Sequence, residues 1–155
     1  MARLGAIPSV ATAATLCGGD SATAAQALGV LAWYGGTRPG VRALTMDATV
    51  LPMVAQLLRT DPLGPSNALL LLTLVTQLAA HSKALRRALC KEGVVRELVD
   101  FLGDPREPYV ESPVTAAAAA ALHAVEGGSS ATRRRCDSTC WEFFIYCGLV
   151  APPCV

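Results

Sequence analysis

The chain has 155 residues, of which 52% are hydrophobic and 16% are charged, a composition that is too apolar and too weakly charged for a disordered protein. Thirteen Lys and Arg oppose 12 Asp and Glu, and the resulting net charge of +1 argues against nucleic-acid binding through a broad basic face. The longest apolar run, residues 68–80, is shorter than the roughly 20 residues of a membrane span and predicts a buried helix. No secretory signal stands out, so we expect a cytoplasmic protein, with nucleus or cilium also possible.

Glycine, proline and capping residues divide the first 126 residues into helices. Glycine pairs at 18–19 and 35–36 stop helices, and Asp20 or Ser21 is expected to cap the helix between them. Residues 39–40, Pro-Gly, are expected to extend the second turn. The predicted helices cover residues 7–16, 22–33, 41–46, 51–59, 67–80, 83–90, 94–102 and 113–125.

Two later helices carry recognisable start signals. Ser66 or Asn67 is expected to cap the long central helix. Ser112 followed by Pro113 is expected to open the Ala-rich helix, because serine caps and proline suits the first turn. Apolar residues recur at helical spacing within the predicted helices, and this periodicity predicts the core. The expected core residues are Leu28, Leu31, Val54, Leu57, Val75, Leu78, Leu98 and Leu122.

Two series of apolar residues recur at equal steps along the chain. Ile7, Leu51 and Val95 are 44 residues apart (51 − 7 = 44, 95 − 51 = 44). The pairs that begin at residues 28, 75 and 122 are 47 residues apart (75 − 28 = 47, 122 − 75 = 47). A period of roughly 40–47 residues with helical spacing inside each unit is typical of α-solenoids of the armadillo or HEAT kind.

The units resemble armadillo repeats, which have a short, a medium and a long helix. Leu-Pro at 51–52, followed by Val54 and Leu57, is similar to the family's second helix, and Ala-Leu-x-x-Leu-Ala at 27–32 is similar to its third. The resemblance covers about residues 3–126. It implies an all-α, right-handed solenoid of about two to three repeats over residues 1–127. The composition changes abruptly after these residues, so we expect an irregular tail over 128–155.

One departure from the family limits what the resemblance implies. In importin-type armadillo proteins the third helix carries a Trp and, four residues later, an Asn that clamp an extended peptide. The matching positions here are Gly29 and Trp33, Thr76 and Ala80, and His123 and Gly127. The Trp/Asn ladder is therefore absent, and binding of nuclear-localisation peptides is not implied.

We expect a non-catalytic protein–protein interaction module, a scaffold or adaptor whose chain is a fragment or short form of a longer solenoid. Its first helices are expected to expose an apolar face that favours self-association. No Ser-His-Asp arrangement, phosphate loop or paired-acid motif is readable, so no catalytic residue, cofactor or metal is predicted. The alternatives are a chaperone-linked helical domain that acts on a folded client, or a zinc-binding regulatory chain. The residues expected to line the partner-binding groove are Trp33, Arg59, Thr76, Ala80 and His123.

Trp33 is the strongest of these candidates, because Trp is enriched at binding hot spots. The alternative is that Trp33 packs on Tyr34 and the following glycine turn. Cys17 and Cys90 are lone and expected to be buried. The tail contains a run of three Arg at 133–135 and half of the chain's aromatics, and it is expected to be poorly ordered and dispensable for folding. Its four cysteines, which carry the zinc alternative, are Cys136, Cys140, Cys147 and Cys154.

Overall fold

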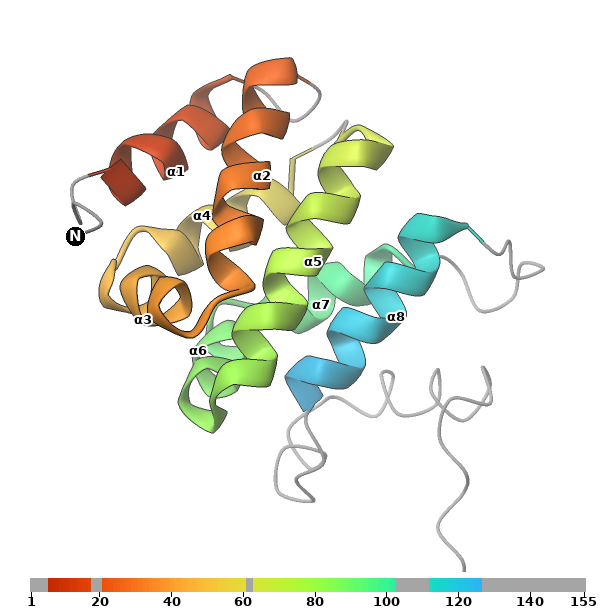
Figure 1. Ribbon diagram of the computed structural model, residues 1–155. Helices are drawn as coiled ribbons and strands as arrows, with labels where there is room; N and C mark the ends of the chain where they lie inside the picture. The colour runs from red at the N-terminus through yellow and green to blue at the C-terminus, as the bar shows by residue number, and fades with distance from the viewer. Residues whose placement is uncertain (1–5, 18–20, 61–62, 103–111, 127–155) are drawn as a thin grey trace, which may run out of the picture.

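The computed structural model describes residues 6–17, 21–60, 63–102 and 112–126, which form α-helices joined by short turns, with no strand in these ranges. The all-α prediction is therefore confirmed for the described part of the chain (Figure 1). In chain order the helices are α1 (Ala6–Leu16), α2 (Ala22–Gly35), α3 (Arg38–Met46), α4 (Val50–Leu58), α5 (Pro65–His81), α6 (Lys83–Lys91), α7 (Val94–Asp100) and α8 (Pro113–Glu126).

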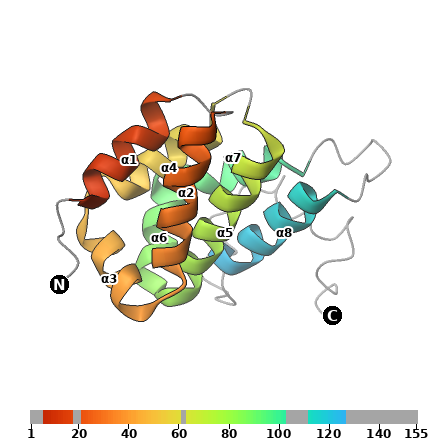
Figure 2. The same cartoon turned by 45° about the horizontal axis from the view of Figure 1, so that its top comes forward.

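The helices pack in two layers and an edge. The long helices α2, α5 and α8 lie side by side and run in the same direction, with α5 in contact with both of the others (Figure 1). Behind them α1, α4 and α7 form a second layer in which α4 contacts both neighbours (Figure 2). The short helices α3 and α6 follow α2 and α5 directly, so they lie at the edge where those long helices end.

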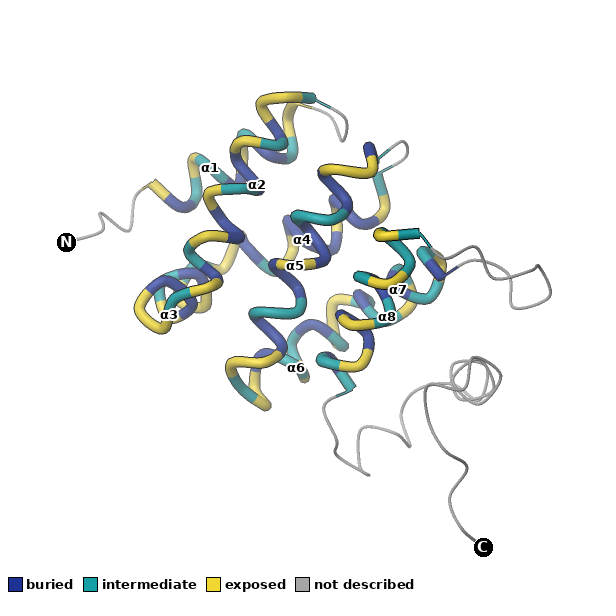
Figure 3. Tube along the Cα trace, turned by 45° about the vertical axis from the view of Figure 1, so that its right-hand side comes forward, coloured by how far each residue is buried: buried dark blue, intermediate teal, exposed yellow. Residues whose placement is uncertain are grey.

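The core lies between the two layers. Buried and exposed residues alternate along each helix, so that each helix has a buried side and an exposed side (Figure 3). The prediction of the core is confirmed at every position. The predicted residues that are buried are Leu28, Leu31, Val54, Leu57, Val75, Leu78, Leu98 and Leu122.

Three of the predicted helix starts are confirmed or corrected by hydrogen bonds. The Ser21 hydroxyl accepts from the backbone N–H of Ala24 at 3.0 Å, and the Ser112 hydroxyl accepts from that of Thr115 at 3.1 Å, so both serines cap as predicted. The central helix begins earlier than predicted, at Pro65, and neither of the two proposed caps is its N-cap. A proline is well suited to the first turn because its missing N–H leaves no unsatisfied donor.

The second correction concerns residues 39–40, which the sequence predicts as an extension of the turn. The Thr37 hydroxyl accepts from the backbone N–H of Gly40 at 3.1 Å and caps α3, which therefore starts at Arg38. Pro39 lies in the first turn of the helix, where its fixed φ is compatible with helical geometry. The Pro-Gly pair thus begins a helix here because a threonine precedes it in capping position.

The apolar face expected on the first helices is small on α1. Its outward positions are occupied by small or polar residues such as Ser9 and Thr12, and Leu16 is its one large exposed hydrophobic side chain. The Thr12 hydroxyl donates to the carbonyl of Pro8 at 2.8 Å, within the helix itself. The described part of α1 therefore offers little apolar area for the predicted self-association.

Candidate interaction surface

The outward side of α2, α5 and α8 forms a surface that carries almost no charge; we call it the long-helix face. Most of its exposed positions on α2 and α8 recur at intervals of three or four residues, and Ser66, Thr73 and Ala80 on α5 recur at intervals of seven, so each set lies on one side of its helix. Among all residues of the three helices, Glu126 is the only Asp, Glu, Lys or Arg. The exposed positions are Ala22, Thr23, Gln26, Val30 and Trp33 on α2, Pro65, Ser66, Thr73, Ala80 and His81 on α5, and Pro113, Ala116, Ala120 and His123 on α8.

Trp33 is the largest side chain exposed on the long-helix face. It is 69% exposed, and Val30, about one turn earlier, is 44% exposed. The ring of Trp33 meets that of Tyr34 edge to face, with centroids 5.3 Å apart. Gly29 lies one turn before Trp33, and a Cβ added there would meet nothing within 4 Å. The indole is therefore held on one side by Tyr34, and most of its area remains open.

Three of the predicted groove residues lie at the same end of this face. Trp33, Ala80 and His123 are all exposed, and each lies within the last four residues of its helix. Because α2, α5 and α8 run in the same direction, these helix ends share one end of the long-helix face (Figure 1). Thr76 is half-buried, and its hydroxyl donates to the carbonyl of Leu72 at 2.8 Å. It is therefore less available to a partner than the other three.

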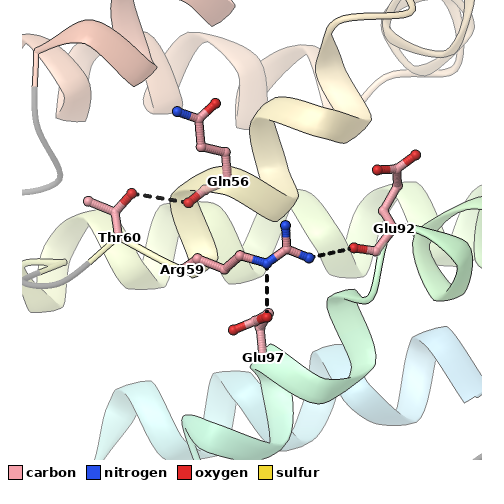
Figure 4. A network of polar contacts seen from close by, with 5 residues as sticks. All are labelled: Gln56, Arg59, Thr60, Glu92 and Glu97. Carbon is pink, nitrogen blue, oxygen red and sulfur yellow. Dashed lines mark hydrogen bonds and ion pairs between the residues drawn. The ribbon is translucent and has the colours of Figure 1, made fainter.

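Arg59 lies apart from the long-helix face, at the end of α4 in the second layer. Its Nε donates to Glu97 Oε1 on α7 at 3.0 Å, and its Nη2 donates to the carbonyl of Glu92 at 2.8 Å (Figure 4). These bonds tie the end of α4 to the turn before α7 and to α7 itself. The turn contains Gly93, whose φ of +80° favours glycine. The structure therefore gives Arg59 a bridging position between α4 and α7 and does not bring it together with Trp33.

Gln77 is a polar residue that the sequence analysis did not single out. Its Oε1 is buried and has no hydrogen-bond partner among the described residues. The amide lies against the end of α2, where a Cβ added at Gly35 would be 2.5 Å from Gln77 Oε1 and 3.2 Å from Leu74 Cδ1. Glycine at position 35 thus allows α5 to approach the end of α2 closely. A glutamine within a mostly apolar run was the available sequence signal.

The cysteines and histidines form no cluster in the described part of the chain. Cys17 is exposed and Cys90 half-buried, so the prediction that both are buried is wrong. Burial raises the pKa of the Cys90 thiol, and the nearby carboxylate of Glu126 raises it further. Within residues 6–17, 21–60, 63–102 and 112–126, no three His, Cys, Asp or Glu side chains are placed to hold a metal ion. The tail with its four cysteines lies outside the described residues.

Among the described helices, none is by itself long and apolar enough to cross a membrane, and α3 and α4, bent by 89°, meet that test only as a pair. Comparison of the chain with protein-family models, curated proteins and solved structures found no match.

Proposed function

We infer that the described helices form a short armadillo-like solenoid and that this solenoid acts as a non-catalytic protein–protein interaction module. The partner binds the long-helix face, with Trp33 as the main contact. The main support for this inference is an uncharged surface that exposes most of a tryptophan side chain. The surface is formed by three helices that run in the same direction.

The order of contacts supports the solenoid. Helices α1, α4 and α7 begin at residues 6, 50 and 94, at steps of 44 residues (50 − 6 = 44, 94 − 50 = 44), and α4 contacts both of the others. Helices α2, α5 and α8 make a second series, with α5 between the other two. Helices equivalent by sequence step thus stack on one another, as expected when each repeat packs on the next.

The chemistry of the face supports binding of a protein with an apolar contact surface. Cores of protein–protein interfaces are depleted in charged residues and enriched in aromatic ones. An exposed Trp supplies a large apolar area at low conformational cost, which is why Trp is frequent among hot spots. The small residues Ala116 and Ala120 on α8 let a partner approach the helix closely. The missing Trp/Asn ladder favours a helix or folded surface over an extended peptide.

The test is partner recovery from cell extract by the full chain and by variants, read by quantitative mass spectrometry. Trp33→Ala and Ala120→Arg should each lose the specifically recovered protein, because one removes the anchor and the other puts a charge on the face. Leu16→Ala is the matched control, since Leu16 is 79% exposed on α1 in the other layer. Circular dichroism must show all three variants folded. Recovery that survives both changes to the face contradicts the proposal.

A further inference from the structure

The short helices α3 and α6 are strongly basic, in contrast to the long helices that precede them. They carry no Asp or Glu. Five of their cationic side chains are exposed, and we call this set the basic edge. The basic edge consists of Arg38 and Arg42 on α3 and of Lys83, Arg87 and Lys91 on α6.

The cations lie on the outward side of each helix. On α6, Lys83, Arg87 and Lys91 follow one another at intervals of four residues, opposite the buried Leu85 and Leu89. Four residues correspond to a rise of about 6 Å along a helix. Each helix therefore presents a row of positive charge to solvent, and both helices lie along the same edge of the molecule (Figures 1 and 2).

A structural role accounts for only part of this charge. Arg86, which is half-buried, donates from Nη1 to the carbonyl of Ala79 at 3.3 Å near the end of α5, where a cation stabilises the helix. Arg38 and Lys83, however, are the first residues of α3 and α6, at the helix end that disfavours cations. Residues spaced four apart on a helix are neighbours, so Lys83 and Arg87 also repel each other. These charges therefore oppose the stability of their own helices.

Two of the described carboxylates are engaged away from the basic edge. Glu97 pairs with Arg59 in the second layer. Asp47, which follows α3, accepts from the backbone N–H and the hydroxyl of Thr49 at 2.9 and 2.6 Å. The positive rows are thus available to an external group of opposite charge.

We propose that the basic edge binds an acidic segment of a partner protein, at a surface separate from the long-helix face. Arginine side chains pair with carboxylates in a two-pronged geometry. A peptide rather than a nucleic acid is favoured because the five cations of the basic edge lie on two helices of nine residues each. The neighbouring long-helix face is uncharged, and the whole chain has a net charge of only +1. Nucleic-acid affinity depends on displacing counterions over an extended basic surface.

The test measures binding of a fluorescein-labelled oligoglutamate peptide to the full chain by fluorescence anisotropy. Arg42→Glu and Arg87→Glu should each weaken binding about tenfold, because each replaces an attraction by a repulsion. Arg96→Glu is the matched control: it makes the same change in net charge at an exposed position of α7 and should change binding less than about twofold. An equal effect of Arg96→Glu would show attraction by net charge alone and overturn the proposal.

Two further measurements separate this proposal from its competitors. An oligoglutamine peptide of the same length should not bind, and oligothymidylate of the same charge should bind more weakly than oligoglutamate. Tighter binding of the oligothymidylate would assign the edge to nucleic acid and overturn the proposal, as would absence of oligoglutamate binding. Trp33→Ala should leave oligoglutamate binding unchanged, so failure of the basic edge and failure of the long-helix face remain distinguishable. Circular dichroism must show each variant folded.

Discussion

The long helices and the short helices of this protein satisfy different constraints. Eight of the 17 residues of α5 are buried, whereas only two of the nine residues of α6 are buried. A helix packed on both sides, like α5, leaves few positions free, so a bulky exposed residue in that layer, such as Trp33 on α2, is informative. Only two leucines of α6 are buried, so packing leaves the identity of most of its residues open. Charged residues of a single sign at those positions are then the informative feature.

The largest expected effect tests the contrast in packing. Leu78→Ala should lower the free energy of unfolding by roughly 2–5 kcal/mol, because Leu78 is 1% exposed between the layers and its loss leaves a cavity. Urea unfolding followed by circular dichroism measures it. Thr73→Ala, at an exposed position of the same helix, should change stability by less than about 0.5 kcal/mol. An effect of Leu78→Ala no larger than that of Thr73→Ala would contradict the packing of α5 between the layers.

A pair of glycines sharpens the contrast with effects of opposite sign. A Cβ at Gly40 in α3 would overlap the backbone carbonyl oxygen of Tyr34 and lie 2.6 Å from the Thr37 hydroxyl that caps the helix. Gly40→Ala should therefore destabilise the protein by about 1–3 kcal/mol. Gly29→Ala, on the open side of α2, should stabilise it by roughly 0.5–1 kcal/mol, because alanine favours helix and nothing obstructs it. Thermal melting of both variants decides; equal signs would contradict the proposed tight turn into α3.

The sequence predicts the core of this fold better than it predicts helix starts and close contacts between helices. Helical periodicity placed Leu28, Val75 and Leu122 in the core correctly, because a buried helix face repeats every three or four residues. The start of α3 was missed because Pro-Gly is a turn signal unless a residue such as Thr37 caps it. The close approach of Gln77 to Gly35 depends on how α5 crosses α2, which no local pattern encodes.

The candidate site was predicted in part for a similar reason. The register of the armadillo third helix identified Trp33, Ala80 and His123, and these lie at one end of the same face. Arg59 follows a medium helix, and its direction toward Glu97 depends on how α4 packs against α7. The basic edge could have been read from the sequence, since α3 and α6 contain only basic charged residues. The net charge of the whole chain is near zero and gives no indication of that local excess of positive charge.

A smaller effect is expected where the second layer is bridged by charge. Arg59→Ala should cost about 0.2–1 kcal/mol, because the Arg59 side chain is 52% exposed and the pair with Glu97 is screened by water. A double-mutant cycle with Glu97→Ala isolates the coupling between the two side chains. Arg96→Ala, an exposed neighbour on α7, is the control. A coupling of zero would mean that the bridge does not help to hold α4 on α7.

The smallest effect tests whether the charges of α6 serve the helix or something outside it. Lys83→Glu should raise stability by a few tenths to about 1 kcal/mol, because an anion at the first residue suits the helix dipole and can attract Arg87 four residues later. Lys91→Glu makes the same charge change at the opposite end of α6, where the dipole effect reverses, so it should be the less stable of the two. Melting temperatures at low ionic strength measure the difference, which salt should reduce. A loss of stability in Lys83→Glu would give that lysine a structural role and remove the argument that the basic edge is retained for a partner.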